Sequence, residues 1–556
     1  MNARTAVLAL IVTVLHASPA TTQQATPFSE TVEVRVTNVE VVVTDRSGKP
    51  VHGLTKDDFE VFENGGRQLI TNFAEIRETT PSGTLTTSAP EAAPADAPRE
   101  TRRRVITLFV DNATLEMGNR NTVLPQLRQF LAAHVRPGDA VAVYLWGNGL
   151  SAQLELTDDQ QAIAKALGSL GTLVARGGPG WRAEFEHEIE DMISNYKPEK
   201  PRMQEAISIA SAYALRATSE MRLKSEALKS VISSLRGLEG RKVLVLLTQQ
   251  LSTNPGEGTF YFLESIRDQF ASPDVLRPTS EARHYVLQDL ARDIAAVANT
   301  AGVTLYPINA SGLSTDMGMR DSSQTSFLAN SSSPHTDTST STLHAIADET
   351  GGRATAGSAN WQLAFDTIAN DLGVYYSLGY RTPGERQDRT KRVEVQLRDK
   401  RGYTVRTRKS IVEQTASTEM TDAVTSHLFH TRAPNDLGIQ TRIGNATPSG
   451  KNLVHPLTIA IPTSTLTLIP DGSEMVGTLS VFTAFLRADG AVSKVGKQTN
   501  LVRFPAASIA NRKAVFVKID VTADPTVTAI SVGVLDEASR ATGFAIIKLP
   551  IGSAGL

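Results

Sequence analysis

The sequence predicts an α/β fold in which a doubly wound, mostly parallel sheet is flanked by an N-terminal β unit and a C-terminal all-β sandwich domain. Three observations lead to this prediction. After residue 104 the pattern switches from strand following strand to strands that alternate with helices, which is typical of a parallel sheet covered by helices. The strands of that region are continuous apolar runs, suited to burial on both faces. Beyond residue 413, short strands separated by turns indicate a sandwich.

The first 20 residues have the organisation of a secretory signal peptide. A positive region ends at Arg4, an apolar run extends from Ala6 to Leu15, and small residues suited to a signal peptidase follow. This run is shorter than the ~20 residues of a spanning helix. We therefore expect a secreted or periplasmic protein with no membrane span after signal removal, and an uncleaved anchor is the alternative.

Residues 29–77 are predicted to form a small β unit. Thr31–Thr44 is dense in β-branched residues, and Leu69–Ile76 returns as a strand after two turns. Residues 78–104 are rich in Thr, Ser, Ala and Pro and end in three arginines, a composition that buries too little apolar surface to fold alone. We expect a linker there, with arginines that keep it solvated rather than bind an acidic partner.

Residues 105–381 are predicted to form the α/β domain, with Gln153–Leu156 as a short edge strand. Its buried strands are expected to be short apolar runs, and the segments between them have helical periodicity. The predicted buried strands are Val105–Val110, Ala140–Trp146, Lys242–Thr248, Val303–Ile308 and Val374–Tyr380, and the predicted helices are Asn121–His134, Asp158–Leu170, Met203–Leu238, Glu281–Ala301, Leu343–Thr350 and Trp361–Leu372.

Two insertions, at residues 171–202 and 310–341, interrupt this pattern. Loops of this length in compact domains carry function or lack order. The first contains a glycine run at residues 177–180, without the lysine of a phosphate-binding loop, and an acidic stretch from Glu184 to Asp191. For the acidic stretch a solvated helix face is favoured over a Ca²⁺ site. The second insertion is crowded with polar residues and is expected to be mobile.

The remainder of the chain is predicted to be β structure. Residues 385–413 have the alternation of a hairpin around a turn at Asp399–Gly402, and we expect this hairpin to pack with the N-terminal β unit because the two flank the α/β domain. Residues 414–556 are predicted to form the sandwich domain. Its strand candidates are Leu457–Ile461, Met475–Leu486, Ala514–Val521, Thr528–Val534 and Gly543–Leu549.

The composition of the 556 residues excludes several classes of function. Lys and Arg total 56 and Asp and Glu total 58, so there is no net field to hold nucleic acid or an anionic membrane. Cysteine is absent, which removes disulfides, thiolate nucleophiles and zinc–cysteine sites. No Gly-x-Ser-x-Gly elbow, phosphate-binding loop or zinc-protease helix motif is present. The sequence therefore predicts no catalytic residues, no cofactor and no nucleic-acid partner.

Five ordered segments resemble a von Willebrand factor type A domain: VITLFVDNATLEMGNRN, RPGDAVAVYLWGNG, KVLVLLT, GVTLYPINA and GVYYSLGYRTPG. With TNVEVVVTDRSGKPVHGLTKDDFEVFENG before them and KRVEVQLRDKRGYTVRTRKS after them, residues 29–413 resemble the VWFA-related proteins of acidobacteria. The resemblance implies a doubly wound sheet with ligand loops at one end. It also raises the question of a divalent cation, since type A domains often hold one in a metal-ion-dependent adhesion site.

The metal motif of that family is incomplete here. Its first loop is Asp-x-Ser-x-Ser, whereas residues 111–115 read DNATL, so that only Asp111 matches. After the fourth strand the family often has an aspartate following a threonine, but residues 248–250 read TQQ. Thr172 is a weak candidate for the family's separate metal-binding threonine. The resemblance thus implies a degenerate site without a metal ion, unless Thr114 or Glu116 compensates.

The predicted ligand face is built from residues that follow two of the buried strands. Asp111 could act there as a metal ligand, as an acid that binds a partner, or as a cap of the following helix, and we expect Asp111→Ala to change partner binding without unfolding the domain. The leading interpretation is an exported, non-enzymatic protein that binds a protein partner. The alternatives are an envelope-associated hydrolase, with a site between the α/β and C-terminal domains, and a structural scaffold. The ligand-face candidates are Asp111, Asn112, Thr114, Glu116 and Gln249.

Overall fold

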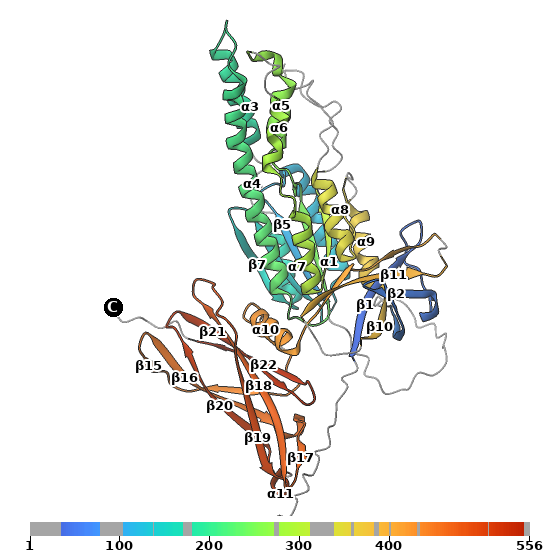
Figure 1. Cartoon of the computed structure of the whole chain (residues 1–556), viewed down its shortest axis with the longest axis vertical. Helices are drawn as coiled ribbons and strands as arrows, with labels where there is room; N and C mark the ends of the chain where they lie inside the picture. The colour runs from blue at the N-terminus through green and yellow to red at the C-terminus, as the bar shows by residue number, and fades with distance from the viewer. Residues whose placement is uncertain are drawn as a thin grey trace, which may run out of the picture.

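The computed structural model shows three parts: a central α/β domain, a β module beside it and a C-terminal β domain (Figure 1). The predicted signal peptide, almost all of the predicted linker, Thr172, the glycine run at residues 177–180 and most of the second insertion lie outside the residues that the structure describes. The described residues are 35–77, 104–136, 138–170, 181–271, 277–311, 338–356, 361–382, 388–399, 402–430, 434–509 and 511–549.

The central domain is built on a five-stranded sheet in the order β7-β6-β5-β8-β9. β5 pairs in parallel with β6 and β8, β8 pairs in parallel with β9, and β7 is an antiparallel edge strand. Every residue of β5 is buried, as its continuous apolar sequence predicts. The predicted α/β class is confirmed. The strands are β5 (Arg104–Asp111), β6 (Ala140–Trp146), β7 (Leu150–Thr157), β8 (Arg241–Thr248) and β9 (Val303–Asn309).

Helices cover both faces of this sheet. Two apolar cores result, one on each side of β5: Leu108 and Val110 belong to the first, and Val105 and Phe109 to the second. The helices of the first core are α1 (Met117–His134), α2 (Gln160–Leu170) and α9 (Trp361–Gly373), and those of the second are α4 (Met203–Ser234), α7 (Leu290–Ala301) and α8 (Thr338–Thr350).

A group of helices rises above the sheet (Figure 1). α4 has 32 residues, which gives a length of about 48 Å, whereas the strands reach roughly 25 Å. Its first half packs with α3 (Trp181–Asn195), α5 (Glu257–Ser265) and α6 (Pro278–Glu281) around a core that includes Phe185 and Ile189. Glu184 and Asp191, at the two ends of the acidic stretch, are exposed on α3, so the predicted solvated helix face is confirmed.

The β module joins segments from both sides of the central domain. Its two sheets have the orders β12-β1-β10-β4 and β13-β11-β2-β3, so that β11 pairs with β2 and β12 with β1 of the N-terminal segment. Within the segment after residue 385, only β11 and β13 pair with each other, because β12 crosses to β1. The strands are β1 (Arg35–Thr44), β2 (Phe59–Glu63), β3 (Gly66–Gln68), β4 (Ile70–Arg77), β10 (Val374–Thr382), β11 (Arg389–Leu397), β12 (Thr404–Arg406) and β13 (Ser410–Glu413).

Two predictions about the limits of the central domain were wrong. The strand predicted at residues 374–380 is β10, which pairs with β1 and β4 instead of joining the parallel sheet. Tyr376 packs in the module core, while Tyr375 lies under the guanidinium of Arg241 in the central domain, 4.1 Å from its ring centroid. Both faces of β10 are therefore buried. Its apolar sequence cannot be distinguished from that of a buried parallel strand by the sequence pattern alone. Arg104 is also not a solvated linker residue, since it is buried in an ion pair with Asp139.

The C-terminal domain has two sheets that share one apolar core. All five predicted strands are present. The sequence analysis missed the helix α10 (Ala416–His427) at the start of the domain, the short helix α11 and the strands β14, β15, β17 and β19. The remaining elements are β14 (Gln440–Ile443), β15 (Thr447–Ser449), β16 (Asn452–Pro462), β17 (Ile469–Asp471), β18 (Glu474–Arg487), β19 (Gly496–Pro505), α11 (Ala506–Ile509), β20 (Ala514–Ala523), β21 (Val527–Asp536) and β22 (Thr542–Lys548).

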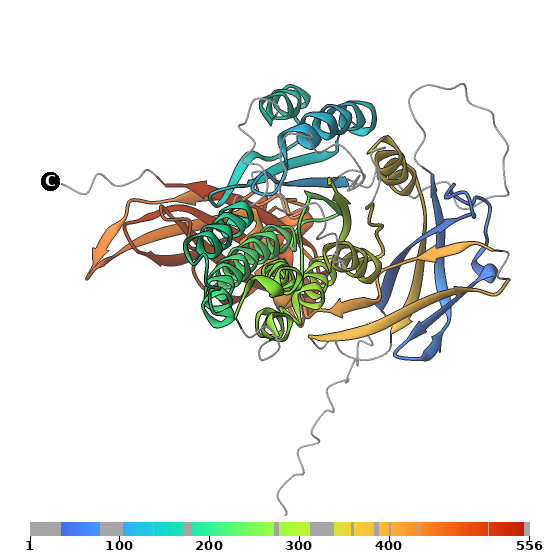
Figure 2. The same ribbon diagram turned by 90° about the horizontal axis from the view of Figure 1, so that it is seen from above.

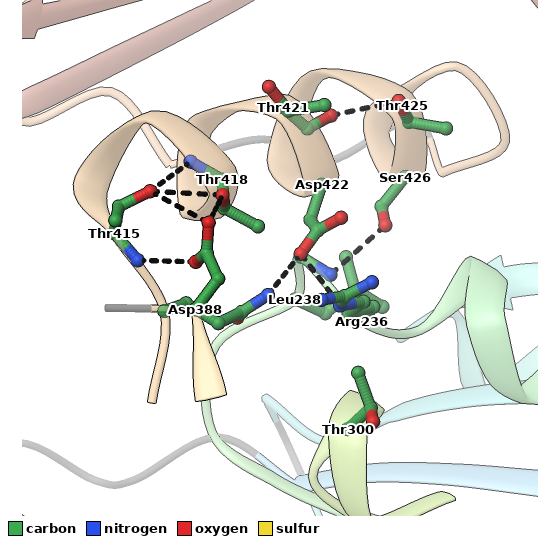
Figure 3. Close-up of polar contacts among 12 residues, drawn as sticks. Arg236, Leu238, Thr300, Asp388, Thr415, Thr418, Thr421, Asp422, Thr425 and Ser426 are labelled. Atoms are coloured by element: carbon green, nitrogen blue, oxygen red, sulfur yellow. Dashed lines mark hydrogen bonds and ion pairs between the residues drawn. The ribbon is translucent and has the colours of Figure 1, made fainter. Parts of the chain in front are cut away.

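α10 connects the C-terminal domain to the loop that follows α4 (Figure 3). Arg236 Nε lies 2.7 Å from Asp422 Oδ2, and the backbone N–H of Gly237 donates to Ser426 Oγ at 3.1 Å. The helix begins at an N-cap, Thr415, whose hydroxyl accepts from the backbone N–H of Thr418 at 3.2 Å. These contacts fix the C-terminal domain at the end of the sheet opposite to the group of rising helices (Figure 1).

Acidification is expected to destabilise this junction. His427 and His430 are almost completely buried. The ring of His427 contacts that of Phe544 edge to face, and the ring Nε2–H of His430 donates to the carbonyl of Ser234 at 3.0 Å. Burial lowers the pKa of each histidine to about 4. Between pH 4 and pH 6.5 the unfolded chain therefore binds more protons at these histidines than the folded chain. Their contribution to the free energy of unfolding is fully present above about pH 6.5 and is lost as the pH falls toward 4.

We expect the free energy of unfolding to fall by roughly 3 kcal/mol per histidine between pH 6.5 and pH 4. This change is measurable as a shift of the urea midpoint. His427→Leu should reduce the pH dependence, because leucine keeps the packing against Phe544 and has no proton to bind. His187→Gln is the matched control, since His187 is 75% exposed and its replacement should leave the dependence unchanged. Equal pH profiles for His427→Leu and the original protein would contradict this account.

Candidate functional site

The predicted ligand-face residues meet at the carboxyl ends of β5 and β8. Asp111 is the last residue of β5 and Thr248 the last of β8, and these strands are parallel neighbours. Their loops therefore open at the same edge of the sheet, which is where open α/β sheets place ligands. This edge faces the rising helices, on the side away from the C-terminal domain; Figure 2 views the molecule from above.

One oxygen of the Asp111 carboxylate receives three hydrogen bonds. Thr114 Oγ1 and Thr248 Oγ1 each donate to Asp111 Oδ2 at 2.7 Å. Lys224 Nζ donates to the same oxygen at 2.8 Å. The exposed fraction of Asp111 is 0%, so its charge is compensated inside the protein by the ammonium of Lys224.

Lys224 reaches Asp111 from the buried side of α4. The residues of α4 that face the domain recur at alternating steps of four and three from Met203 to Val231, and Lys224 occupies one of these positions. Its exposed fraction is only 4%, and its ammonium also donates to the carbonyl of Gln250. The sequence analysis missed this residue. The signal available in the sequence was a lysine in a repeat of buried helix positions whose other members are largely apolar.

Gln249 connects three loops around this ion pair. Its side-chain Nε2 donates to the carbonyl of Ala310 at 3.0 Å, and its Oε1 accepts from the backbone N–H of Glu116 at 2.9 Å. Its backbone N–H donates to Thr114 Oγ1 at 3.3 Å. The loops that follow β5, β8 and β9 are thus held by one side chain.

The structure brings the five predicted residues together but buries most of them. Asp111, Asn112 and Thr114 are less than 9% exposed, Gln249 is partly exposed and Glu116 is exposed. Asp111 therefore has no carboxylate surface to offer a partner. It is not the helix cap either, because α1 begins at the N-cap Glu116 and no side chain caps it.

These residues do not fit a divalent cation while the ammonium of Lys224 is in place. Mg²⁺ requires several oxygen ligands with free lone pairs, and Asp111 is the one carboxylate in this network. The hydroxyls of Thr114 and Thr248 donate to Asp111 Oδ2 and accept from the backbone N–H groups of Gln249 and Gln250, the latter at 3.1 Å. Asp111 Oδ1 is buried and accepts no hydrogen bond from the described residues. An ammonium already lies 2.8 Å from the carboxylate. Within the described ranges, no group of three or more His, Asp or Glu side chains is arranged to hold a metal ion.

Surface cavities of the central domain occur beside α4 and beside α5 among the described residues. The cavity beside α4 has a volume of about 440 Å³ and lies between α4 and the segment that leads into α7. Arg222, Lys229 and Asp293 are among the residues that line it. The cavity beside α5 has a volume of about 270 Å³ and is lined by Glu257, Tyr261 and other residues of α5, α6 and their neighbours. No histidine lines either cavity.

No family model and no curated protein matches this chain. Among solved structures, it is similar to an aerotolerance-related membrane protein of Bacteroides fragilis, with 12% identity, a TM-score of 0.23 and coverage of 49% of this chain and 98% of that one. It is also similar to the conserved hypothetical protein BatB of Bacteroides thetaiotaomicron, with 13% identity, a TM-score of 0.24 and coverage of 49% and 97%. Manganese-loaded TRAP of Plasmodium vivax is 9% identical, with a TM-score of 0.23 and coverage of 55% and 93%. TM-scores this low support no inference about function.

None of the helices in the described ranges is both long enough and apolar enough to cross a bilayer.

Proposed function

We propose that this is an exported, non-enzymatic protein whose central domain has the doubly wound arrangement of a type A domain and binds a protein partner through the loops at the carboxyl end of its sheet. The observation that carries the proposal is the buried network of Asp111, Lys224 and Gln249, which fixes three loops in one arrangement. A surface that is rigid before it binds loses less conformational entropy on association.

The fixed loops present side chains suited to an interface. Met117 is 60% exposed at the start of α1, beside the exposed carboxylate of Glu116. Leu150, the first residue of β7, is 38% exposed on the same edge of the sheet. Apolar anchors of this kind, surrounded by polar groups, dominate the energy of many protein interfaces. The acidic group that could perform chemistry, Asp111, is buried and paired, which favours binding over catalysis.

Affinity capture of native envelope proteins on the immobilised chain tests the proposal. We expect a specific partner that is retained equally with Mg²⁺ and with a chelator. Met117→Asp should weaken its binding by about tenfold or more, because the substitution places a charge where an apolar contact is lost. Phe516→Asp is the matched control: Phe516 is 62% exposed on β20 of the C-terminal domain, so this variant should bind normally.

The opposite pattern would contradict the proposal. If Phe516→Asp abolished binding and Met117→Asp did not, the C-terminal domain would be the binding part. Turnover of ester or peptide substrates that survives repurification of the chain would favour the hydrolase alternative.

A further inference from the structure

We infer that the ammonium group of Lys224 takes the place of a divalent cation in the loops at the carboxyl end of the sheet, as a permanent part of the chain. The inference goes beyond the proposed function and does not depend on it, because it concerns the charge balance of the site and not a partner. It assigns to Lys224 the task of neutralising Asp111 and joining the loops that follow β5 and β8.

The charges of the site support this assignment. A carboxylate with no exposed surface must be paired with a positive group, and Lys224 Nζ is 2.8 Å from Asp111 Oδ2. No other salt bridge to Asp111 occurs in the part of the chain that the structure describes. The pair is electrically balanced without any ion from solution.

The geometry supports it as well. The ammonium contacts Asp111 at the end of β5 and the carbonyl of Gln250 just after β8, so that it bridges two adjacent loops through oxygen atoms. A hard cation bridges loops in the same way, through carboxylate, hydroxyl and carbonyl oxygens. An ammonium differs in one respect: it is covalently attached to α4 and cannot dissociate. The hydroxyls of Thr114 and Thr248 complete the oxygen-rich surroundings.

The substitution Lys224→Ala should therefore convert the site into one that depends on a cation. Truncation leaves a space next to the oxygens of Asp111, Gln250 and the two threonines, and removes the like charge that excludes Mn²⁺. Ligand binding to the folded state alone raises stability with the logarithm of ligand concentration. The unfolding temperature of the variant should be low in chelator and rise with Mn²⁺, whereas that of the original full chain should be the same in both.

The experiment compares four proteins in Mn²⁺ and in chelator: the original chain, Lys224→Ala, Asp111→Ala and the double variant Lys224→Ala/Asp111→Ala. Electron paramagnetic resonance counts free Mn²⁺ in parallel. We expect bound Mn²⁺ in Lys224→Ala alone. Mn²⁺ that binds the original chain and is lost on Asp111→Ala would overturn the inference, since the cation would then share the site with the lysine. If Lys224→Ala has the unfolding temperature of the original chain, or fails to fold both with Mn²⁺ and without it, a cation cannot replace the ammonium and the inference is wrong.

Discussion

Lys224→Met is expected to destabilise the central domain by about 3–5 kcal/mol, because it leaves the carboxylate of Asp111 buried without a compensating charge. Asp111→Asn and Asp111→Ala should each have an effect of similar size, since they strand the ammonium of Lys224. Both side chains are at least 95% buried, so solvent cannot replace the missing partner. Urea unfolding of the full chain, followed by circular dichroism, measures the change.

The double variant Asp111→Asn/Lys224→Met is the control for this prediction. It replaces the charged pair by neutral side chains of similar size, and buried ion pairs replaced in this way often lose little stability. The double variant should therefore be more stable than either single variant, with a coupling energy that identifies the pair. Additive effects of the two substitutions would show that the residues act independently and would contradict the ion pair. A stable, normally folded Asp111→Ala would restore the expectation that Asp111 serves a partner rather than the fold.

Gly237→Ala is expected to separate the C-terminal domain from the central domain. A Cβ atom at this position would lie 2.3 Å from the Cα of Ala423 and 2.6 Å from its backbone nitrogen. Backbone atoms of a helix cannot move aside as a flexible side chain can, so α10 must shift away from the loop after α4. We expect the free energy of unfolding to fall by about 3 kcal/mol or more. The contact between Arg236 and Asp422 should be lost as well. The unfolding transition should split into two as the domains lose their coupling.

Gly168→Ala is the matched control for Gly237→Ala. Gly168 is an exposed residue of α2, and nothing lies within 4 Å of the position of its Cβ atom. Alanine has a higher helix propensity than glycine, so the free energy of unfolding of this variant should rise by roughly 0.5–1 kcal/mol. A single unfolding transition at the original midpoint for Gly237→Ala would mean that α10 does not dock on this loop.

The parts of the fold that could be predicted from sequence are those in which local pattern and burial agree. β5 and β8 are continuous apolar runs in a two-faced sheet, and their ends could be predicted to meet because parallel strands share an edge. β10 has a similar run, yet it belongs to the β module, because the central domain covers its second face. Only the tertiary structure distinguishes the two cases.

The candidate site could be predicted in part. Asp111, Thr114 and Gln249 lie in loops that the strand pattern brings together, and the incomplete metal motif already indicated that a cation would lack ligands. Lys224 could not be found in this way, since it is 113 positions from Asp111 and contacts it only through the packing of α4 on the sheet. α10 was missed for another reason: only five of its twelve residues are buried, so that its apolar pattern is weak.

The central claim is that this site contains an internal ammonium instead of a divalent cation. Crystals of the original chain grown with Mn²⁺ test it most directly, because anomalous scattering locates manganese independently of the rest of the structure. The account predicts no manganese peak near Asp111 and Lys224 Nζ within hydrogen-bond distance of Asp111 Oδ2. A manganese peak at Asp111, with the side chain of Lys224 turned away, would contradict it.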